Sequence, residues 1–263
     1  MDLGLNGKFG IVCASTKGLG FSVAESLLNE GCELILCSSK EENIKTAKNK
    51  LQSKGLNKFD IIKADLSTDN GVLSLYKFAI AKSSKIDILV NNCGGPDLGN
   101  FENINEDQLL DAFNKNLKNI FKLTKLILPI MESNQWGRIV NITSSSAKQP
   151  IDNLLLSNIM RAGVAGLSKS ISNEYAKSNI MINNVLPGRI LTDRIIELAK
   201  ERSKGTGIKI EEILENLGKD LPISRIGKPE EFAPIVTFLC SERASYITGN
   251  SLTVDGGLVK SLF

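Results

Sequence analysis

Short, continuously apolar segments alternate with longer segments of helical period along the chain, and this alternation constrains the fold most. The segments predicted to be strands are residues 8–14, 32–37, 59–66, 86–92, 137–144, 180–188 and 251–257. The segments predicted to be helices are residues 20–31, 41–55, 71–84, 105–134, 154–170, 192–217 and 229–241. Apolar strands separated by helices are typical of a parallel sheet with both faces covered. Right-handed crossovers then produce a doubly wound α/β sheet with helices on both faces.

The composition limits the number of domains and the class of partner. The 263 residues, 42% of them hydrophobic, show no linker or shift in composition, so we predict one domain over residues 1–263. The polar helical segment at 192–217 is predicted to belong to a flap, or substrate lid, over about 190–225. With 32 basic and 29 acidic residues the net charge is +3, which gives no basic footprint for nucleic acid.

No apolar run reaches the ~18 residues of a membrane span, and the first residues do not read as a signal peptide. The five scattered cysteines are typical of reduced thiols, so we predict a cytoplasmic protein. The chain contains no histidine, which excludes Ser-His-Asp hydrolysis and removes the commonest zinc ligand. We therefore predict no metal site.

A glycine-containing turn joins the first predicted strand to the first predicted helix. Its sequence is ASTKGLG, residues 14–20, in which Gly18 and Gly20 permit close approach of a ligand and close packing of the helix. Backbone N–H groups at such a helix N-terminus bind phosphate. The position of the turn at the first strand–helix junction favours a dinucleotide site over a plain tight turn.

Several further motifs follow in a fixed order: KADL with Asp65, NNCGG at 91–95, Asn116 in NKNLKNIF, NITSSS with Ser144, PGRILT at 187–192, and VDGG at 254–257. Together with the turn they resemble the short-chain dehydrogenase/reductase family along nearly the whole chain. The resemblance implies a Rossmann-type fold and an oxidoreductase that uses a nicotinamide dinucleotide. The family's first glycine of the turn is Ala14 here.

The resemblance also implies which residues bind the cofactor. They are Ser15, Thr16, Lys17, Gly18, Leu19, Gly20, Ser38, Ser39, Lys40, Asp65, Leu66, Asn92, Gly94, Arg161, Pro187, Gly188, Ile190 and Thr192. No carboxylate stands at the end of the second strand to hold the 2′-hydroxyl of NAD, and Lys17 occupies a position that is often basic in NADP-preferring members. We predict NADP(H) in preference to NAD.

The catalytic residues that the resemblance implies are Asn116, Ser144, Ser157 and Arg161. The family has a tyrosine thirteen residues after its serine and a lysine four residues later, where this chain has Ser157 and Arg161. Residues four apart share a helix face, so both should point at the cofactor. A serine hydroxyl is a weak acid and arginine stays protonated, so the proton donor must differ. Lys148, Asp152 or a water held by Asn116 and Ser144 are candidates.

Three functions remain open at this level. The first is an NADP-dependent oxidoreductase acting on a small carbonyl or alcohol, with Arg161 and Ser144 polarising the oxygen. The second is a non-catalytic NADP-binding sensor or partner subunit, and the third, a minor option, is a non-redox lyase, isomerase or dehydratase. The substrate pocket is expected around residues 94–101 and the flap, with Asp97, Arg189 and Arg194 as candidate contacts. The apolar spacing at 119–131 is consistent with a subunit interface, and we predict a homo-oligomer, a homotetramer in preference to a dimer.

Overall fold

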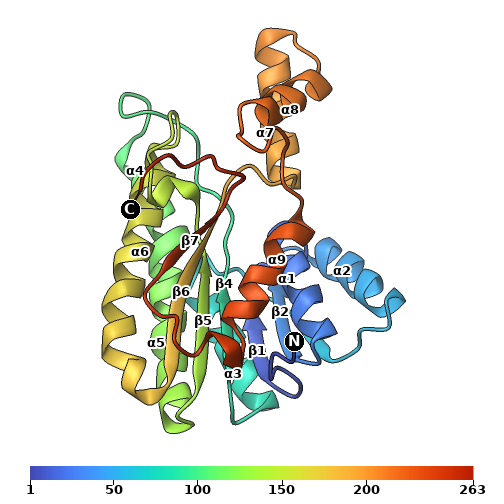
Figure 1. The fold of residues 1–263 in the computed structure, drawn as a ribbon, viewed down its shortest axis with the longest axis vertical. Helices are drawn as coiled ribbons and strands as arrows, with labels where there is room; N and C mark the ends of the chain where they lie inside the picture. The colour runs from blue at the N-terminus through green and yellow to red at the C-terminus, as the bar shows by residue number, and fades with distance from the viewer. Residues whose placement is uncertain (263) are drawn as a thin grey trace.

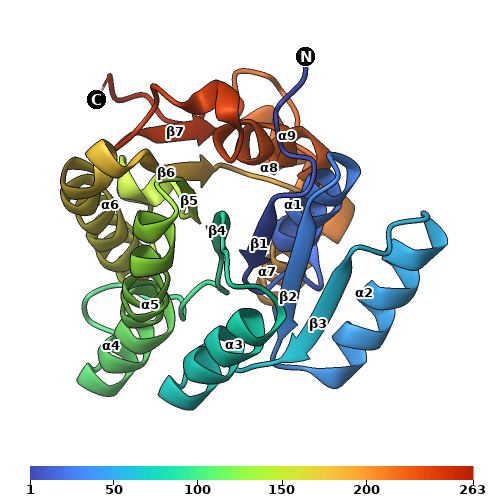
Figure 2. The same cartoon turned by 90° about the horizontal axis from the view of Figure 1, so that it is seen from below.

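The computed structural model describes residues 1–262, and within them seven parallel strands form one sheet in the order β3-β2-β1-β4-β5-β6-β7. Phe263, the last residue of the predicted domain, lies outside the described residues. Helices cover both faces of the sheet (Figures 1 and 2). The predicted doubly wound α/β fold is therefore confirmed, and every predicted strand is present in the sheet.

The element bounds are as follows. The strands are β1 (Phe9–Val12), β2 (Glu33–Ser38), β3 (Phe59–Lys63), β4 (Ile88–Asn91), β5 (Gly137–Ile142), β6 (Ile180–Pro187) and β7 (Ser251–Val254). The α-helices are α1 (Gly18–Asn29), α2 (Glu41–Ser53), α3 (Asp69–Lys82), α4 (Glu106–Phe113), α5 (Asn119–Ser133), α6 (Leu155–Tyr175), α7 (Asp193–Thr206), α8 (Ile210–Lys219) and α9 (Pro229–Leu239). The short helices are η1 (Asn114–Lys118), η2 (Ser145–Ala147), η3 (Ala176–Ser178) and η4 (Glu242–Ala244).

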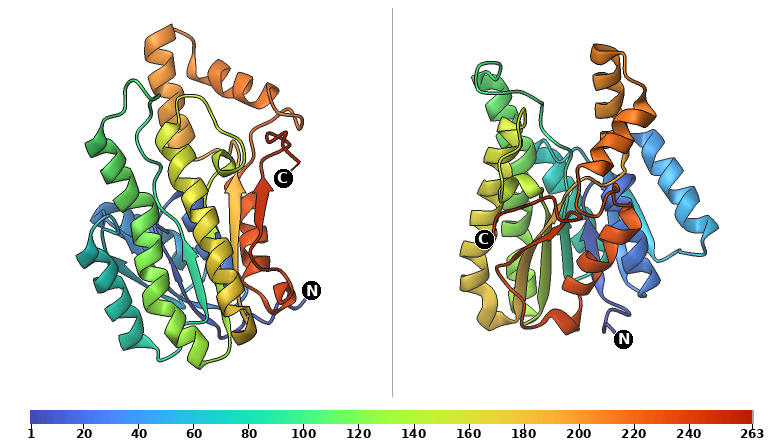
Figure 3. Two further views of the ribbon diagram at one scale, coloured as in Figure 1. Left: turned by 90° about the vertical axis from the view of Figure 1, so that its left-hand side faces the viewer. Right: turned by 45° about the horizontal axis from the view of Figure 1, so that its top comes forward.

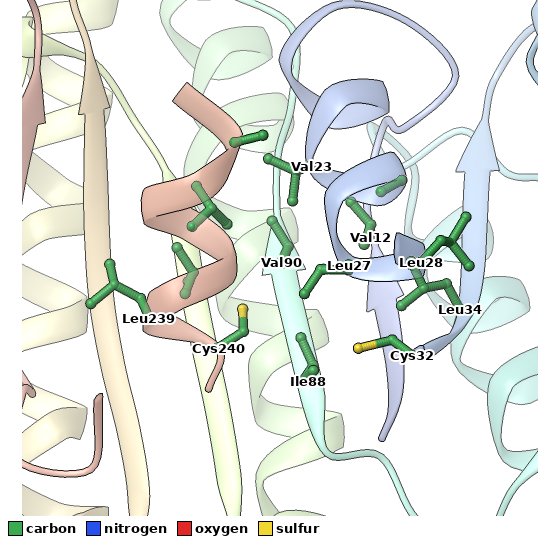
Figure 4. Packing of buried hydrophobic residues seen from close by; sticks show 14 of the residues in the cluster. Val12, Val23, Leu27, Leu28, Cys32, Leu34, Ile88, Val90, Leu239 and Cys240 are labelled. Atoms are coloured by element: carbon green, nitrogen blue, oxygen red, sulfur yellow. The ribbon is translucent and has the colours of Figure 1, made fainter. Parts of the chain in front are cut away.

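Two apolar cores lie on opposite faces of the sheet. On one face, α1 and α9 pack against the central strands, as Figure 4 shows for Val12, Val90 and Leu239. On the other face, α3, α5 and the end of α6 cover side chains such as Ile11 and Ile139. Neighbouring strand residues point to opposite faces, so a strand buried on both sides must be apolar throughout. This requirement explains the unbroken apolar runs in the sequence.

The predicted helix at 105–134 is interrupted by one wider turn. The segment Asn114–Lys118 is a π-helix in which the Asn119 N–H bonds the Asn114 carbonyl oxygen. The Asn119 side chain donates to the Lys115 carbonyl oxygen at 2.7 Å and so occupies an acceptor in the widened turn. Such turns insert one residue into a helix and occur often at functional sites. Apolar period alone does not distinguish a π-turn from a regular helix.

The predicted flap consists of two helices rather than one. Helix α7 ends at Thr206 because Gly207 adopts a left-handed conformation with φ of 73°, and α8 follows. Both helices stand beyond the carboxyl ends of the strands (Figures 1 and 3). A backbone bridge between Ile190 and Gly227 joins the two ends of the segment to each other. No helix in residues 1–262 has the length and apolar character required to cross a membrane.

Candidate active site

A cleft of about 810 Å³ runs along the carboxyl ends of the strands and under α7. Its walls come from the segments that follow β1 to β6, together with residues of the flap. The strand order reverses at this place in the sheet, because β1 pairs with β2 on one side and with β4 on the other. In doubly wound sheets, ligands bind at this switch point, outside the carboxyl ends of the strands.

The glycine turn forms one end of the cleft. Gly18 begins α1 with φ of 57°, and a Cβ on Gly20 would clash with the Ala14 carbonyl oxygen and lie 2.7 Å from Asn92 Nδ2. Both positions therefore require glycine, the first for its conformation and the second for close packing. Ala14 itself adopts φ of 45°, a left-handed conformation that an L-residue adopts only at a cost. Its place in the turn is one that would also suit glycine.

Two of the residues predicted to bind the cofactor are turned away from the cleft. Ser15 is fully buried, where its hydroxyl donates to the Val12 carbonyl oxygen at 2.7 Å and accepts from the Cys37 N–H at 3.3 Å. It ties β1 to β2 instead of facing a ligand. Gly20 packs α1 against the turn and does not line the cleft.

The other predicted cofactor residues line the cleft. They are Thr16, Lys17, Gly18, Leu19, Ser38, Ser39, Lys40, Asp65, Leu66, Asn92, Gly94, Arg161, Pro187, Gly188, Ile190 and Thr192. After β2, the exposed Ser39 and Lys40 stand beside Asn43 from the first turn of α2, a residue that sequence reasoning missed. Among the residues that line the cleft, the carboxylate nearest in sequence to Ser39 and Lys40 is that of Asp65, which follows β3. It accepts hydrogen bonds from the Ser67 N–H and hydroxyl. This corner of the cleft therefore presents hydroxyl, amide and ammonium groups.

Lys17 connects the glycine turn to the flap. Its ammonium group lies 3.9 Å from an Asp193 carboxylate oxygen at the start of α7, and both side chains are largely exposed. Thr192, the residue before Asp193, is the nearest neighbour of a Cβ built on Gly18. The start of α7 therefore lies against the glycine turn, while the remainder of α7 and α8 extends outward (Figure 1).

Ser144, Ser157 and Asn116 line the part of the cleft away from the glycine turn. The Ser144 hydroxyl oxygen accepts from the Ser146 N–H at 3.1 Å, which leaves its proton available to an oxygen in the cleft. The Ser157 hydroxyl lies 3.1 Å from the hydroxyl of Ser146, a buried residue that sequence reasoning did not single out. Asn116, held by the π-turn, is 1% exposed and its Oδ1 has no partner.

Arg161 lies one turn after Ser157 on α6 and is only 4% exposed. Its Nη1 donates to Cys93 Sγ at 3.2 Å and its Nη2 to the Gly94 carbonyl oxygen at 3.4 Å. Its Nε has no partner. Within residues 1–262, the buried side-chain nitrogen and oxygen atoms without a partner are Arg161 Nε, Asn116 Oδ1 and Thr143 Oγ1, and all three residues line the cleft. Buried polar atoms are nearly always paired, so these three mark the part of the fold where polar groups remain unsatisfied.

Of the remaining candidates, only Arg194 lines the cleft. Lys148 and Asp152, proposed as substitute acids, do not line the cleft, and neither does Asp97. Arg189 donates to the Leu217 carbonyl oxygen and to Asp220, so it connects the segment before α7 to the end of α8. Arg194 does line the cleft, and its Nη2 donates to the Pro96 carbonyl oxygen at 3.3 Å.

Three buried thiols lie at or beside the ends of β1 and β2. Cys13, directly after β1, and Cys37, in β2, stand side by side; their mutual hydrogen bond raises the pKa of the Cys13 thiol and lowers that of Cys37. Burial raises the pKa of Cys32 to about 12. Within residues 1–262, no three histidine, cysteine, aspartate or glutamate side chains lie together as a metal site requires.

Comparison with known proteins agrees with this architecture. The family profile described as enoyl-(acyl carrier protein) reductase matches residues 13–259. The chain belongs to the short-chain dehydrogenase/reductase family. NADPH-dependent reductase BacG of Bacillus subtilis is 30% identical over 95% of this chain and 97% of its own length. Dehydrogenase/reductase SDR family member 4 of Oryctolagus cuniculus is 34% identical over 96% and 94%.

A solved structure of another short-chain dehydrogenase/reductase superposes closely. L-sorbose reductase from Gluconobacter frateurii, complexed with NADPH and L-sorbose, has a TM-score of 0.95 and 30% identity, with 100% of both chains covered. The family assignment rests on nearly the whole chain in each comparison. It therefore includes the flap and the residues around Ser157 and Arg161, and not the nucleotide half alone.

Proposed function

We propose that this chain is an NADPH-dependent oxidoreductase that reduces the carbonyl group of a small substrate, with Ser157 and Arg161 in place of the family's tyrosine and lysine. The observation that carries the proposal is the Arg161 guanidinium, which is buried in the wall of the cleft with an unpartnered Nε. The same cleft continues to the glycine turn and the lysines around it. BacG and L-sorbose reductase, which cover the whole fold, are described as NADPH-dependent or as NADPH complexes.

The residues at the turn suit a dinucleotide with a 2′-phosphate. Gly18 allows the backbone to approach a pyrophosphate, Gly20 allows α1 to pack against the turn, and the N-terminus of α1 favours negative charge. Lys17 and Lys40 would neutralise the additional phosphate, and the Ser39 hydroxyl would donate to it. NAD lacks this phosphate, so it cannot form the corresponding ion pairs and hydrogen bond with these residues.

When bound, NADPH supplies the hydride, and this chain's residues must stabilise the negative charge that develops on the carbonyl oxygen. The Ser144 hydroxyl and the Arg161 guanidinium are the available donors in the cleft wall. Fixed donors aimed at a developing oxyanion typically contribute 10²–10³-fold each to kcat. Because an alkoxide is a strong base, it can then take its proton from a water beside Asn116 and Ser144, and a proton from bulk solvent neutralises the hydroxide that remains.

The replacement of tyrosine by Ser157 also supports a second function, a non-catalytic NADP(H)-binding sensor or partner subunit. A serine hydroxyl is a far weaker acid than a phenol, and no tyrosine lines the cleft in residues 1–262. In that case the protein would bind NADPH without oxidising it.

Measurement of NADPH oxidation by the purified protein, across aldehydes, ketones and quinones, distinguishes the two. We expect turnover that falls 10²–10³-fold in Arg161→Ala at saturating NADPH. We expect part of it to return in Arg161→Lys. Lys169→Ala, which removes an exposed charge from the same helix, is the control and should not change kcat. NADPH binding without turnover, or turnover that survives Arg161→Ala, would favour the sensor or a different catalytic residue.

We further propose a cytoplasmic homo-oligomer, a dimer or a tetramer. The outer faces of α4 and α5 expose Leu110 and Phe121, which are 58% and 48% accessible. Exposed apolar side chains on adjoining helices are typical of an interface between subunits. A monomeric mass from light scattering at micromolar concentration would contradict the proposal.

A further inference from the structure

Arg161 is a buried cation without a counter-charge. Its two contacts are the Cys93 sulfur and the Gly94 carbonyl oxygen, and no carboxylate in residues 1–262 forms an ion pair with it. Removing a charged group from water costs several kcal/mol unless an opposite charge or hydrogen bonds offset it. At the corresponding place the family has a lysine that faces an acidic phenol, and here the phenol is absent while the cation remains. A negative group from outside the chain would complete this site.

A second guanidinium, that of Arg194, contacts the same short segment, residues 94–96. Arg194 of α7 bonds the Pro96 carbonyl oxygen, two residues after the Gly94 carbonyl oxygen that Arg161 bonds. Arg194 is exposed and likewise forms no ion pair. Glu197 lies one turn further along α7, is exposed, and pairs with neither arginine. The two arginines therefore make this end of the cleft positively charged.

The phosphates of the cofactor are not the missing anion. The groups suited to phosphate lie at the glycine turn and after β2, whereas Arg161 lies beside Ser144, Ser157 and Asn116. Apolar side chains complete the wall around this end: Leu98, Leu154, Ile195 and Leu198. A ligand that matches both features has a short apolar chain and a negatively charged group next to the reacting carbonyl.

We infer that the substrate is a 2-oxo carboxylic acid whose carboxylate binds at the Arg161 guanidinium. In such a molecule the carboxylate and the ketone oxygen are on adjacent carbons. One planar guanidinium and the Ser144 hydroxyl can then serve both oxygens. Arg194 strengthens the binding from the flap. This inference rests on the proposed function, since it names the substrate of the same site.

The test uses a probe that cannot be reduced. Oxamates have the shape and charge of 2-oxo acids but an unreactive amide carbonyl, and the corresponding oxamides are neutral. Calorimetry compares N-butyloxamate with N-butyloxamide on the NADP⁺-loaded protein. We expect the oxamate to bind at least tenfold more tightly, which corresponds to about 1.4 kcal/mol.

Variants assign the site to Arg161. Arg161→Gln should abolish the preference for the oxamate, Arg161→Lys should restore part of it, and Arg194→Gln should reduce it less. Arg202→Gln removes an exposed charge from the same helix as Arg194, away from the cleft wall, and should leave the preference unchanged.

The two proposals fail in different ways. Equal binding of the two probes, no binding of the oxamate, or a preference that survives Arg161→Gln would overturn the carboxylate site even if the protein oxidises NADPH with a neutral ketone. Preferential oxamate binding without NADPH oxidation by any 2-oxo acid would support the site and overturn the reductase.

Discussion

Replacement of Ala14 by glycine should stabilise the protein, although glycine usually destabilises. Ala14 has φ of 45°, and an L-residue in the left-handed region costs roughly 1–2 kcal/mol. Glycine removes that cost but gives the unfolded chain more freedom, worth roughly 0.4–1 kcal/mol. The expected net gain is about 0.5–1 kcal/mol, or roughly 1–2 °C in Tm for a domain of this size.

The assay is urea and thermal unfolding of Ala14→Gly beside a matched variant. Ala162→Gly makes the same chemical change at an exposed position inside α6, where glycine should cost about 1 kcal/mol. The two substitutions should therefore shift the urea midpoint in opposite directions. If both variants lose stability by similar amounts, Ala14 is not strained, and the reasoning from its φ is refuted.

Three other outcomes can be measured. Asn141→Leu should lower the free energy of unfolding by about 3 kcal/mol, because it removes three buried hydrogen bonds, to Asn91, Ser168 and Asn184; a loss under about 1 kcal/mol in urea would contradict this. Iodoacetamide should label Cys93, which is half-buried in the cleft wall, and NADPH should protect it. Cys32, whose pKa is raised to about 12 by burial, should stay protonated and unlabelled up to about pH 10 by mass spectrometry; rapid labelling of Cys32 in the folded protein would show that it is not buried. Replacing Lys17 and Lys40 by alanine should weaken NADPH binding about 10–100-fold by calorimetry and NADH binding far less; an NADH Kd equal to or below that of NADPH in the unaltered protein would contradict the cofactor preference.

The buried amide network illustrates what sequence reasoning did not reach. Asn141 of β5 donates to Ser168 and Asn184 and accepts from Asn91, so one side chain connects three adjacent strands and α6. In the sequence these are isolated polar residues within apolar runs, and the run alone predicts a strand without indicating partners. Such a network requires knowledge of which strands are neighbours, because every bond crosses between segments far apart in the chain.

Much of the cleft could nevertheless be predicted. The family resemblance predicted Ser38, Asp65 and Ser144 as site residues, and all three line the cleft, because the carboxyl ends of the strands of a parallel sheet meet at one edge. The prediction was wrong for Ser15, because a residue within a turn can face inward or outward and its hydroxyl found partners on β1 and β2. The flap was predicted as one helix, because helical period continues across Gly207, whereas the left-handed conformation of that glycine ends α7.

The sequence by itself determined the α/β class and the number of strands. These follow from the pattern of apolar residues, since a strand covered on both faces must be apolar throughout. The tertiary structure alone decided that Arg161 has no counter-charge among residues 1–262. Its contacts come from Cys93 and Gly94, 68 and 67 residues earlier in the chain. Whether a buried cation is paired depends on which groups, distant in sequence, the fold brings within a few ångströms of it. The local sequence does not specify these distances.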